Sequence, residues 1–595
     1  MKIILRLLVF VRNRWGWLAL AFGCLVASTG FAMIIPRMLG DGVDTALRVG
    51  ESGFMWWPVA RETAIWLVAG TIIVSSTLRG VSEYGQQYLS EVVSQKVSYD
   101  IRNAIYDRLQ RLSFAYYDQA QTGQLMSRAT VDVEAIRMFF GMGLLGIVQA
   151  LIMVVGISII LLLMDWRLAL MTMAFLPFIG WIAYKFSSHI RPMWLRIQEQ
   201  LAVLGTRLQE SLTGIRIVKS FSREKEEGQK FATQATVLYN EQMGIARQMA
   251  HNMPFMMLIM GLPTILIFWY GGREVIAGTM TIGNLLQFIL YVGMMVMPVR
   301  RMGMMVNLLS RTVSAGQRIL EILDTESAVR EKPDAIELGR LKGEVIFEEV
   351  NFSYNSMSPT LNNISFDVKP GQLVALLGGS GSGKSTIANL ISRFYDVTSG
   401  RITVDGTDIR DVTLNSLRKN VGISQQDIFL FSGTIRNNIA YGAVDADMQQ
   451  IEAVAKAAQL HDFVQSLPDG YDTWVGERGL TLSGGEKQRL AIARTLLINP
   501  SILILDDSTS SVDAETEHLI RQALDKLIEG RTTFVITHRI PIIKSADLIL
   551  MLDQGRIVET GKHNDLMAKE GLYYQIYQSQ LMTDNNTEED SERSK

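Results

Sequence analysis

The residues with the clearest chemistry form a glycine-rich stretch of the pattern G-x-x-x-x-G-K-[ST]. Backbone N–H groups of such a turn, at a helix N-terminus, bind phosphate oxygens. Lys384 is then expected to reach the β- and γ-phosphates, and the Ser385 hydroxyl to ligate Mg²⁺. An apolar strand-like run precedes the stretch and a helical one follows, which argues against an ordinary surface turn. The predicted nucleoside triphosphate site comprises Gly378, Gly379, Ser380, Gly381, Ser382, Gly383, Lys384, Ser385 and Thr386.

Two further segments suit the same chemistry. The apolar run Ser501–Leu505 predicts a buried strand that ends in Asp506 and Asp507, and an acid there can hold Mg²⁺ opposite the phosphate loop. Leu482 begins a Ser-Gly-Gly-Glu turn before a helix rich in Arg and Ala, which is a second helix N-terminus suited to phosphate. That turn is a weak signal alone and a strong one beside a phosphate loop. Its residues are Ser483, Gly484, Gly485 and Glu486.

These motifs require an α/β domain, and short β-rich runs alternating with helices from Gly343 onward predict one. The first half of the chain instead contains six apolar stretches of membrane-spanning type. A cleaved signal peptide would have a shorter apolar core than the first stretch. The second is the weakest and reaches full length only by continuing past Arg79. The six predicted spans are Gly16–Ile35, Thr63–Leu78, Met138–Met164, Leu168–Tyr184, Asn252–Tyr270 and Val275–Val299.

The segments between the spans indicate the orientation. Arg79–Arg137 and Lys185–Arg247 are rich in Lys and Arg, as is the amphipathic start Met1–Trp15, which places them in the cytoplasm. Both long segments show helical spacing, so the membrane helices are expected to extend well beyond the bilayer. The predicted organisation is a transmembrane domain over 1–323, a linker over 324–342, a nucleotide-binding domain over 343–583 and a disordered tail over 584–595.

Composition agrees with a membrane protein of more than one domain. The chain has 595 residues, of which 48% are hydrophobic and 19% charged. A net charge of −2 gives no reason to expect a nucleic-acid partner. One cysteine, Cys24, excludes an internal disulfide framework.

Taken together, these features resemble the ATP-binding cassette (ABC) transporters, specifically exporter-type half-transporters with six spans fused to one nucleotide-binding domain that has a helical subdomain. The resemblance covers essentially the whole chain. It implies that Tyr354 stacks on the adenine of ATP, that Gln426 contacts Mg²⁺ and the attacking water, and that His538 lies near the γ-phosphate. It also implies that Asp513 belongs to the D-loop and that Gly476–Gly479 is the exporter-specific segment.

The same resemblance implies a dimer in the cytoplasmic membrane of a prokaryote, with the nucleotide-binding domains in the cytoplasm. Two cassettes would pack head to tail, each ATP lying between one phosphate loop and the other cassette's signature. ATP then favours the closed pair and hydrolysis releases it. Thr122–Arg128 and Glu210–Ile215 look like the two coupling regions that pass this motion to the spans.

One residue departs from the family pattern. The family usually carries a glutamate after the Mg²⁺-linked aspartate, and this chain has Asp507, which is one methylene shorter. A base withdrawn by more than about 1 Å can cost roughly 10²-fold in rate. We therefore favour a heterodimer in which this chain's own site hydrolyses ATP poorly, over a homodimer in which Asp507 still works. The retained His538 is an argument for the homodimer, because weak sites in the family often lose it.

The sequence gives the least information about the transported compound. The 30 methionines, many in the fifth and sixth spans, suit a cavity for varied apolar shapes, although each could equally face lipid. Charged residues are nearly absent from the predicted spans, which argues against an ion pump. We expect export of hydrophobic or amphipathic compounds. The alternatives are a floppase for a lipid or lipid-linked precursor, and an ATP-binding regulatory subunit that gates a catalytic partner.

Overall fold

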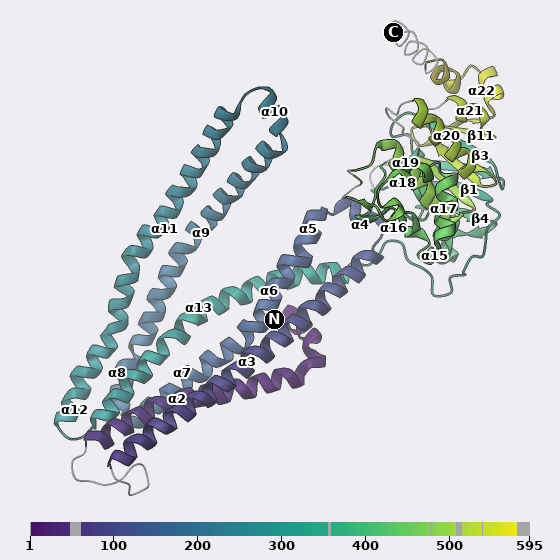
Figure 1. The fold of residues 1–595 in the computed structure, drawn as a ribbon. Coiled ribbons are helices and arrows are strands. Elements are labelled where there is room, and N and C mark those ends of the chain that lie inside the picture. The colour runs from purple at the N-terminus through teal and green to yellow at the C-terminus, as the bar shows by residue number, and fades with distance from the viewer. Residues whose placement is uncertain are drawn as a thin grey trace. The chain divides into compact units, whose positions relative to one another are not determined.

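The computed structural model describes residues 2–47, 61–354, 359–425, 427–476, 479, 481–506, 514–537 and 540–579. The described residues form two compact units. The helical unit lies within Met1–Gln110 and Thr122–Thr325, and the α/β unit within Arg111–Gln121 and Glu326–Lys595. Figure 1 shows the two kinds of architecture, long helices in one unit and a strand-rich globule in the other.

The helical unit is built from long helices interrupted by short π-helical or 3₁₀ segments. Its elements are α1 Lys2–Leu7, η1 Leu8–Arg14, α2 Trp15–Leu47, α3 Arg61–Arg111, α5 Thr122–Ser127, η2 Arg128–Asp132, α6 Val133–Met138, η3 Phe139–Gly143, α7 Leu144–Met164, α8 Trp166–Met173, α9 Phe175–Thr213, α10 Ile215–Ser220, α11 Glu224–Leu266, η4 Ile267–Gly271, α12 Gly272–Ile276 and α13 Ile282–Asp324. The long α3, α9 and α11 agree with helices that extend beyond a bilayer.

Four described helical stretches are long and apolar enough to cross a membrane: Trp15–Leu47, Ile65–Arg111, Thr122–Met164 and Glu224–Ile276. They include most or all of the first, second, third and fifth predicted spans. The sixth predicted span overlaps a shorter apolar stretch, Ile282–Pro298. The predicted fourth span is divided between α8 and α9 and is not among the four. A membrane-spanning helical unit is thus supported, while the number six stays a prediction.

One predicted turn in this unit is confirmed, and another is wrong. Asp165 lies between α7 and α8 as predicted, and its side chain caps α8 by accepting the N–H of Arg167 (2.8 Å). The predicted fifth and sixth spans leave Gly271–Glu274 as the turn between them, and this turn is wrong, because helix continues to Ile276. The chain turns instead at Gly278, which has φ +75°, and Thr281 caps α13 through the N–H of Asn284.

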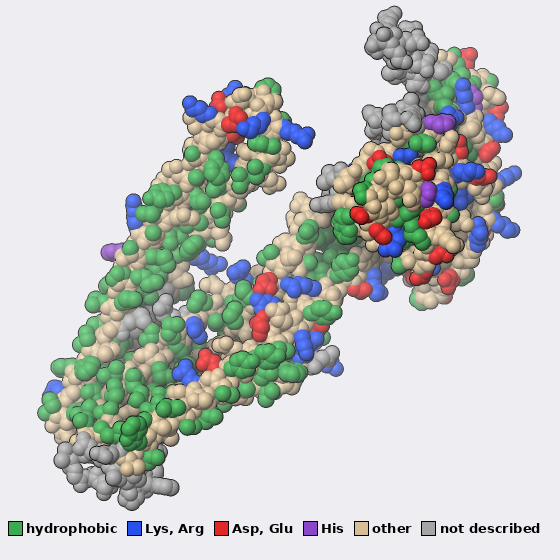
Figure 2. Space-filling model, viewed as in Figure 1, with side chains coloured by type: hydrophobic (Ala, Val, Ile, Leu, Met, Phe, Trp, Pro, Cys, Tyr) green, Lys and Arg blue, Asp and Glu red, His purple; other side chains and the backbone are tan. Residues whose placement is uncertain are grey.

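Packing in the helical unit brings α2, α7 and α13 together. A Cβ on Gly283 would lie 2.1 Å from the carbonyl oxygen of Gly40, so the backbones of α2 and α13 touch there. Arg318 of α13 forms a bidentate ion pair with the buried Asp132 of η2, at 2.8 and 2.5 Å. Figure 1 shows α9 and α11 side by side, joined by α10, and Figure 2 shows hydrophobic side chains covering much of the helical unit, with charged ones gathered near α10.

The α/β unit contains a four-stranded sheet of order β2-β1-β4-β5 and a six-stranded sheet of order β12-β11-β3-β10-β9-β6. The strands are β1 Val345–Phe352, β2 Leu361–Val368, β3 Leu373–Gly378, β4 Ser399–Val404, β5 Thr407–Asp408, β6 Val421–Ser424, β7 Gly433–Thr434, β8 Trp474–Val475, β9 Ile502–Asp506, β10 Thr532–Ile536, β11 Leu548–Asp553 and β12 Arg556–Gly561. Four of the five pairings in the larger sheet are parallel, and only the β11–β12 pairing is antiparallel.

Helices cover the sheets and form a separate lobe. They are α4 Phe114–Gln119, α14 Lys384–Ile391, η5 Ile409–Asp411, α15 Leu414–Asn420, α16 Ile435–Ile439, η6 Ala440–Gly442, α17 Met448–Ala457, α18 His461–Ser466, η7 Gly470–Asp472, α19 Gly484–Ile498, α20 Ala514–Ile528, α21 Ile540–Ser545 and α22 His563–Ala568. One hydrophobic core packs α16–α20 against residues such as Leu503 and Leu505 of β9. The predicted α/β fold with a helical subdomain is confirmed.

Candidate nucleotide site

The glycine-rich loop follows β3, the strand that lies between β10 and β11, and ends where α14 begins at Lys384. The predicted strand–loop–helix order is therefore confirmed. Gly378 and Gly383 have φ of +146° and +106°. A Cβ at Gly378 would meet the carbonyl oxygen of Leu552 at 2.2 Å, and one at Gly383 would meet Leu361 at 2.5 Å. Both positions require glycine, because only glycine combines this backbone with so little space.

Lys384 lies across this loop. Its Nζ donates to the carbonyl oxygens of Gly378 (2.9 Å) and Gly379 (2.7 Å). Burial lowers the pKa of the Lys384 ammonium, and the nearby Asp506 carboxylate partly opposes that effect. A partly desolvated cation is thus held over a loop of backbone N–H groups, which is an arrangement that attracts phosphate.

Asp506 ends β9 at the same edge of the sheet. Its register partner on β10 is Ile536, which in turn pairs with Leu376 of β3, so Asp506 lies two strands from the loop. The carboxyl ends of parallel strands form the ligand-binding edge of such sheets. Two other predicted site residues follow β6 and β10 in the sequence, and both of these strands run parallel to β9. Those residues, Gln426 and His538, lie outside the described part of the chain, as do Asp507 and Asp513.

The signature turn begins α19 as predicted. Ser483 is the N-cap, and its hydroxyl accepts the N–H of Glu486 (3.3 Å), while the Glu486 carboxylate accepts the N–H of Ser483 (2.8 Å). This capping box fixes the start of the helix. Gly484 is exposed at the first helical position, so the N-terminus is accessible to an anion. Gly476 and Gly479 of the exporter-specific segment are described, and Glu477 and Arg478 are not.

Tyr354 lies beside the phosphate loop, and its contact with the base stays a prediction. Its hydroxyl is 3.2 Å from the Thr386 hydroxyl, and the residue is 43% exposed. The ring meets Tyr395 edge-on, with centroids 5.1 Å apart. An exposed ring face next to a phosphate-binding loop can stack on a planar base.

Sequence reasoning missed the segment that connects to this aromatic group. The sequence predicts the first coupling region at Thr122–Arg128, whereas the residues grouped with the α/β unit are Arg111–Gln121. Phe114 of α4 stacks on Phe394 at 4.3 Å, and the Tyr395 hydroxyl donates to Asp118 at 2.8 Å. Only the run of aromatics from Phe114 to Tyr117 could have indicated a docking segment.

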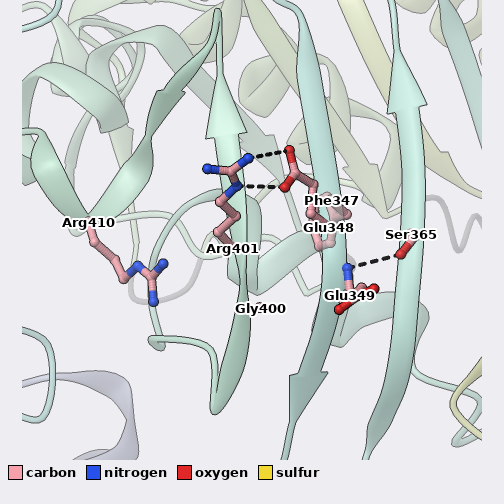
Figure 3. Close-up of a pocket in the computed structure, with 7 residues that line it drawn as sticks. All are labelled: Phe347, Glu348, Glu349, Ser365, Gly400, Arg401 and Arg410. Atoms are coloured by element: carbon pink, nitrogen blue, oxygen red, sulfur yellow. Dashed lines mark hydrogen bonds and ion pairs between the residues drawn. The ribbon is translucent and has the colours of Figure 1, made fainter.

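A hollow of about 520 Å³ on the four-stranded sheet offers no alternative nucleotide site. Figure 3 shows the Arg401 guanidinium directed at the Glu348 carboxylate on the neighbouring strand, at 2.6 and 3.0 Å. The Ser365 hydroxyl accepts the N–H of Glu349 (2.9 Å) in the same view. These polar groups are used within the sheet, and none of the hollow's described lining residues belongs to the phosphate loop.

Comparison with known proteins covers both units. Residues 18–299 match the family described as ABC transporter transmembrane region, and residues 361–510 match the family described as ABC transporter. The chain belongs to the ABC transporter family. Its arrangement, one transmembrane region fused to one nucleotide-binding domain, is that of an exporter half-transporter.

Two relatives and one solved structure show the extent of the similarity. An ATP-dependent lipid A-core flippase of Syntrophus aciditrophicus (strain SB) is 36% identical, over 99% of this chain and 96% of its own. A putative multidrug export ATP-binding/permease protein, YgaD, of Bacillus subtilis (strain 168) is 39% identical, over 92% and 93%. The structure of a bacterial Atm1-family ABC exporter with ATP bound matches with a TM-score of 0.76 at 30% identity, over 96% of this chain and 98% of that one.

The family membership decides the general activity. The chain is a membrane-spanning ABC exporter subunit that binds ATP and couples its hydrolysis to transport. A half-transporter carries one nucleotide-binding domain, so it functions as a dimer.

Proposed function

We propose that this transporter exports hydrophobic or amphipathic compounds across the cytoplasmic membrane of a prokaryote by alternating access. The observation that carries the proposal is the Lys384 ammonium held over the phosphate loop near Asp506, in a chain whose other unit is a membrane bundle. Relatives named as a lipid A-core flippase and as a putative multidrug exporter support both cargo alternatives. Transport of a lipid or lipid-linked precursor is the second candidate.

The residues at the site fit a magnesium ion. A hydroxyl at Ser385, a carboxylate at Asp506 and the amide of Gln426 are oxygen donors of the kind that Mg²⁺ prefers, together with nucleotide phosphates. When bound, the ion would neutralise charge on the β- and γ-phosphates. Lys384 would contribute its charge to the same phosphates, Tyr354 would orient the base, and His538 would contact the γ-phosphate.

For the assembly we propose a heterodimer. Asp507 stands where the family usually has glutamate, so this chain's own phosphate loop would serve a slowly hydrolysing site. The capped N-terminus of α19, with Ser483, Gly484 and Gly485, is intact and would complete the partner's site. By resemblance to the family, Asp513 would act as the D-loop residue. A homodimer that uses Asp507 as its base, and a mainly ATP-binding regulatory subunit, are the alternatives.

Coupling would use α4 and α10. The tip between α9 and α11 exposes large apolar side chains, including Leu212, Ile217 and Phe221. The α/β unit exposes an aromatic patch of Phe429, Phe431 and Tyr441, the last two stacked at 4.4 Å. Exposed apolar groups on two elements of one subunit suit reciprocal docking in a dimer. The tip of one chain would lie on the patch of the other.

The proposed function is tested by reconstituting the purified chain in proteoliposomes, alone and with its partner half-transporter. ATP-dependent movement of a fluorescent lipid or of an amphipathic dye would support export, and comparison of the two probes separates floppase from drug export. ATP binding without hydrolysis by the chain alone, and turnover only with the partner, would favour the regulatory role. Absence of movement of every probe, despite ATP turnover by the assembled pair, would contradict export of such compounds.

A further inference from the structure

The helical unit contains a cavity of about 1020 Å³ lined by residues of α2, α3, the η3–α7 segment and α13. Its volume is that of a pocket for a drug-sized molecule or for part of a lipid. Figure 1 shows these helices bundled together. Since the nucleotide motifs are in the other unit, this cavity is the best-defined candidate for the cargo, and the inference below therefore rests on the proposed export function.

The apolar part of the lining is aliphatic. No described lining residue is Phe, Tyr, Trp or His. Planar aromatic cations are commonly held by stacking and cation–π contacts, which need aromatic rings. Unbranched thioether side chains adapt instead to flexible chains of variable shape. Six methionines supply much of this surface: Met142, Met153, Met294, Met297, Met304 and Met305.

Besides four charged residues, the polar part of the lining contains six uncharged hydrogen-bonding side chains. Gln86 accepts at 3.5 Å from the Ser28 hydroxyl, so this contact is long and weak. The hydroxyl of Thr29 is buried and has no hydrogen-bond partner among the described residues. A buried hydroxyl of this kind costs free energy unless a ligand or water pairs with it. The polar set is Ser28, Thr29, Gln86, Gln87, Ser90 and Gln149.

Charges in the lining balance. Two arginines, Arg79 and Arg301, are matched by Glu83 and Glu91. Arg79 lies 3.9 Å from Glu83, and Glu91 is paired with Arg137 at 2.5 Å. Both acids therefore already have cationic partners on the protein. Arg301 is exposed to solvent, and the formal charge of the lining is zero, so the lining carries no net charge with which to neutralise an anionic or a cationic head group.

We infer that the cavity binds an aliphatic-chain lipid whose head group is uncharged and rich in hydroxyls, such as a glycosylated diacylglycerol. Glutamine amides donate and accept, as do hydroxyls, so they match a sugar on both counts. The methionine side chains would contact the aliphatic chains of the lipid. The lining that this chain contributes thereby favours such a cargo over a planar aromatic cation and over a phosphate-bearing lipid.

The test uses the complete transporter, with its partner subunit, in phosphatidylcholine proteoliposomes. Four additives are compared by stimulation of ATPase activity and by ATP-dependent movement: dioleoyl glucosylglycerol, dioleoyl phosphatidylglycerol, dioleoyl trimethylammonium-propane and ethidium. The three lipids share their tails, so differences report on the head group. The glucosyl lipid is expected to stimulate at a mole fraction about three- to tenfold lower than the charged lipids, which corresponds to one or two net hydrogen bonds.

Two variants locate the effect. Gln149→Leu and the near-isosteric Thr29→Val should each raise the half-stimulating fraction of the glucosyl lipid by about two- to tenfold. Gln242→Leu, at an exposed position on α11, is the matched control and should leave it unchanged. Basal ATPase activity and the thermal unfolding midpoint show which variants are folded. If Gln149→Leu does not fold, Thr29→Val alone still tests where the head group binds.

The outcomes separate a failure of the head-group inference from a failure of the proposed export function. Equal or stronger stimulation and movement by a charged lipid or by ethidium would overturn the inference and leave the export function standing. Wild-type behaviour of folded Gln149→Leu and Thr29→Val would overturn the placement of the head group. If no additive moves while ATP turns over, the proposed function fails, and the inference fails with it.

Discussion

At the scale of single residues, Lys384 differs from an ordinary exposed lysine in its burial and in its contacts. Its ammonium is partly buried, which lowers its pKa, and it is directed back onto the carbonyl oxygens of Gly378 and Gly379. A cation with few water contacts gains more from phosphate than an exposed lysine does. The same position next to Asp506 would keep the charge close to the phosphates as they react.

Lys384→Ala should weaken ATP binding by this chain roughly 10- to 150-fold, since a charge-assisted hydrogen bond contributes about 1.5–3 kcal/mol. Photolabelling by an ATP analogue at Tyr354 should decrease in parallel. Lys369→Ala, at an exposed position in the turn between β2 and β3, is the control. Unchanged labelling in Lys384→Ala would mean that the nucleotide does not use this loop.

At the scale of elements, α4 is connected to the nucleotide site through one aromatic group. Tyr395 meets Tyr354 edge-on, and its hydroxyl donates to Asp118 of α4. Burial, together with Asp118, raises the pKa of Tyr395, so its hydroxyl stays protonated at any physiological pH. Tyr354, which we propose contacts the base, and α4 thus share Tyr395 as a neighbour.

Tyr395→Phe removes this hydrogen bond and keeps the ring. Basal ATPase activity should stay within about twofold of wild type, and stimulation by cargo should fall several-fold, as expected for the loss of about 1 kcal/mol of coupling. Tyr106→Phe, at an exposed position on α3, is the control. Undiminished stimulation in a folded Tyr395→Phe protein would show that α4 does not transmit the signal through this contact.

The elements also show where sequence reasoning stops. The phosphate loop and the α19 cap are local patterns, and the sequence predicts both because a few adjacent residues determine them. The contact between Asp118 and Tyr395 joins residues 277 positions apart, which no periodicity reveals. The adjacent Gly271 and Gly272 suggest a turn in the sequence, but both residues are helical. The chain turns after Ile276, where Gly278 adopts the left-handed conformation. Arg79 and Glu83 follow the second predicted span, so their place in the cavity was not anticipated.

At the scale of the whole molecule, one chain would supply half of each nucleotide site and half of the transport pathway. A dimer is required because the phosphate loop and the signature of one chain would serve different ATP molecules. The choice between a heterodimer and a homodimer depends on Asp507, since the described parts of the site, Lys384, Asp506 and the α19 N-terminus, fit either assembly.

Asp507→Glu and Asp507→Asn decide between these assemblies. If aspartate is merely too short, Asp507→Glu should restore the reach of the base and raise ATPase activity, within a limit of roughly 10²-fold at this site. In a heterodimer Asp507→Asn should change total turnover little, because the partner's site performs most of it. In a homodimer Asp507→Asn should remove nearly all turnover, since an amide cannot accept the proton.

The measurement is the steady-state ATPase rate of both variants, with the partner half-transporter present and absent. Lys384→Ala in the same background is a useful reference, because it empties this chain's site without altering the partner's phosphate loop. If the weak-site proposal is right, Lys384→Ala and Asp507→Asn should both leave most of the partner-dependent hydrolysis, and only Asp507→Glu should add to it. Rapid hydrolysis by the purified chain alone, lost on Asp507→Asn, would instead establish a homodimer with aspartate as its working base.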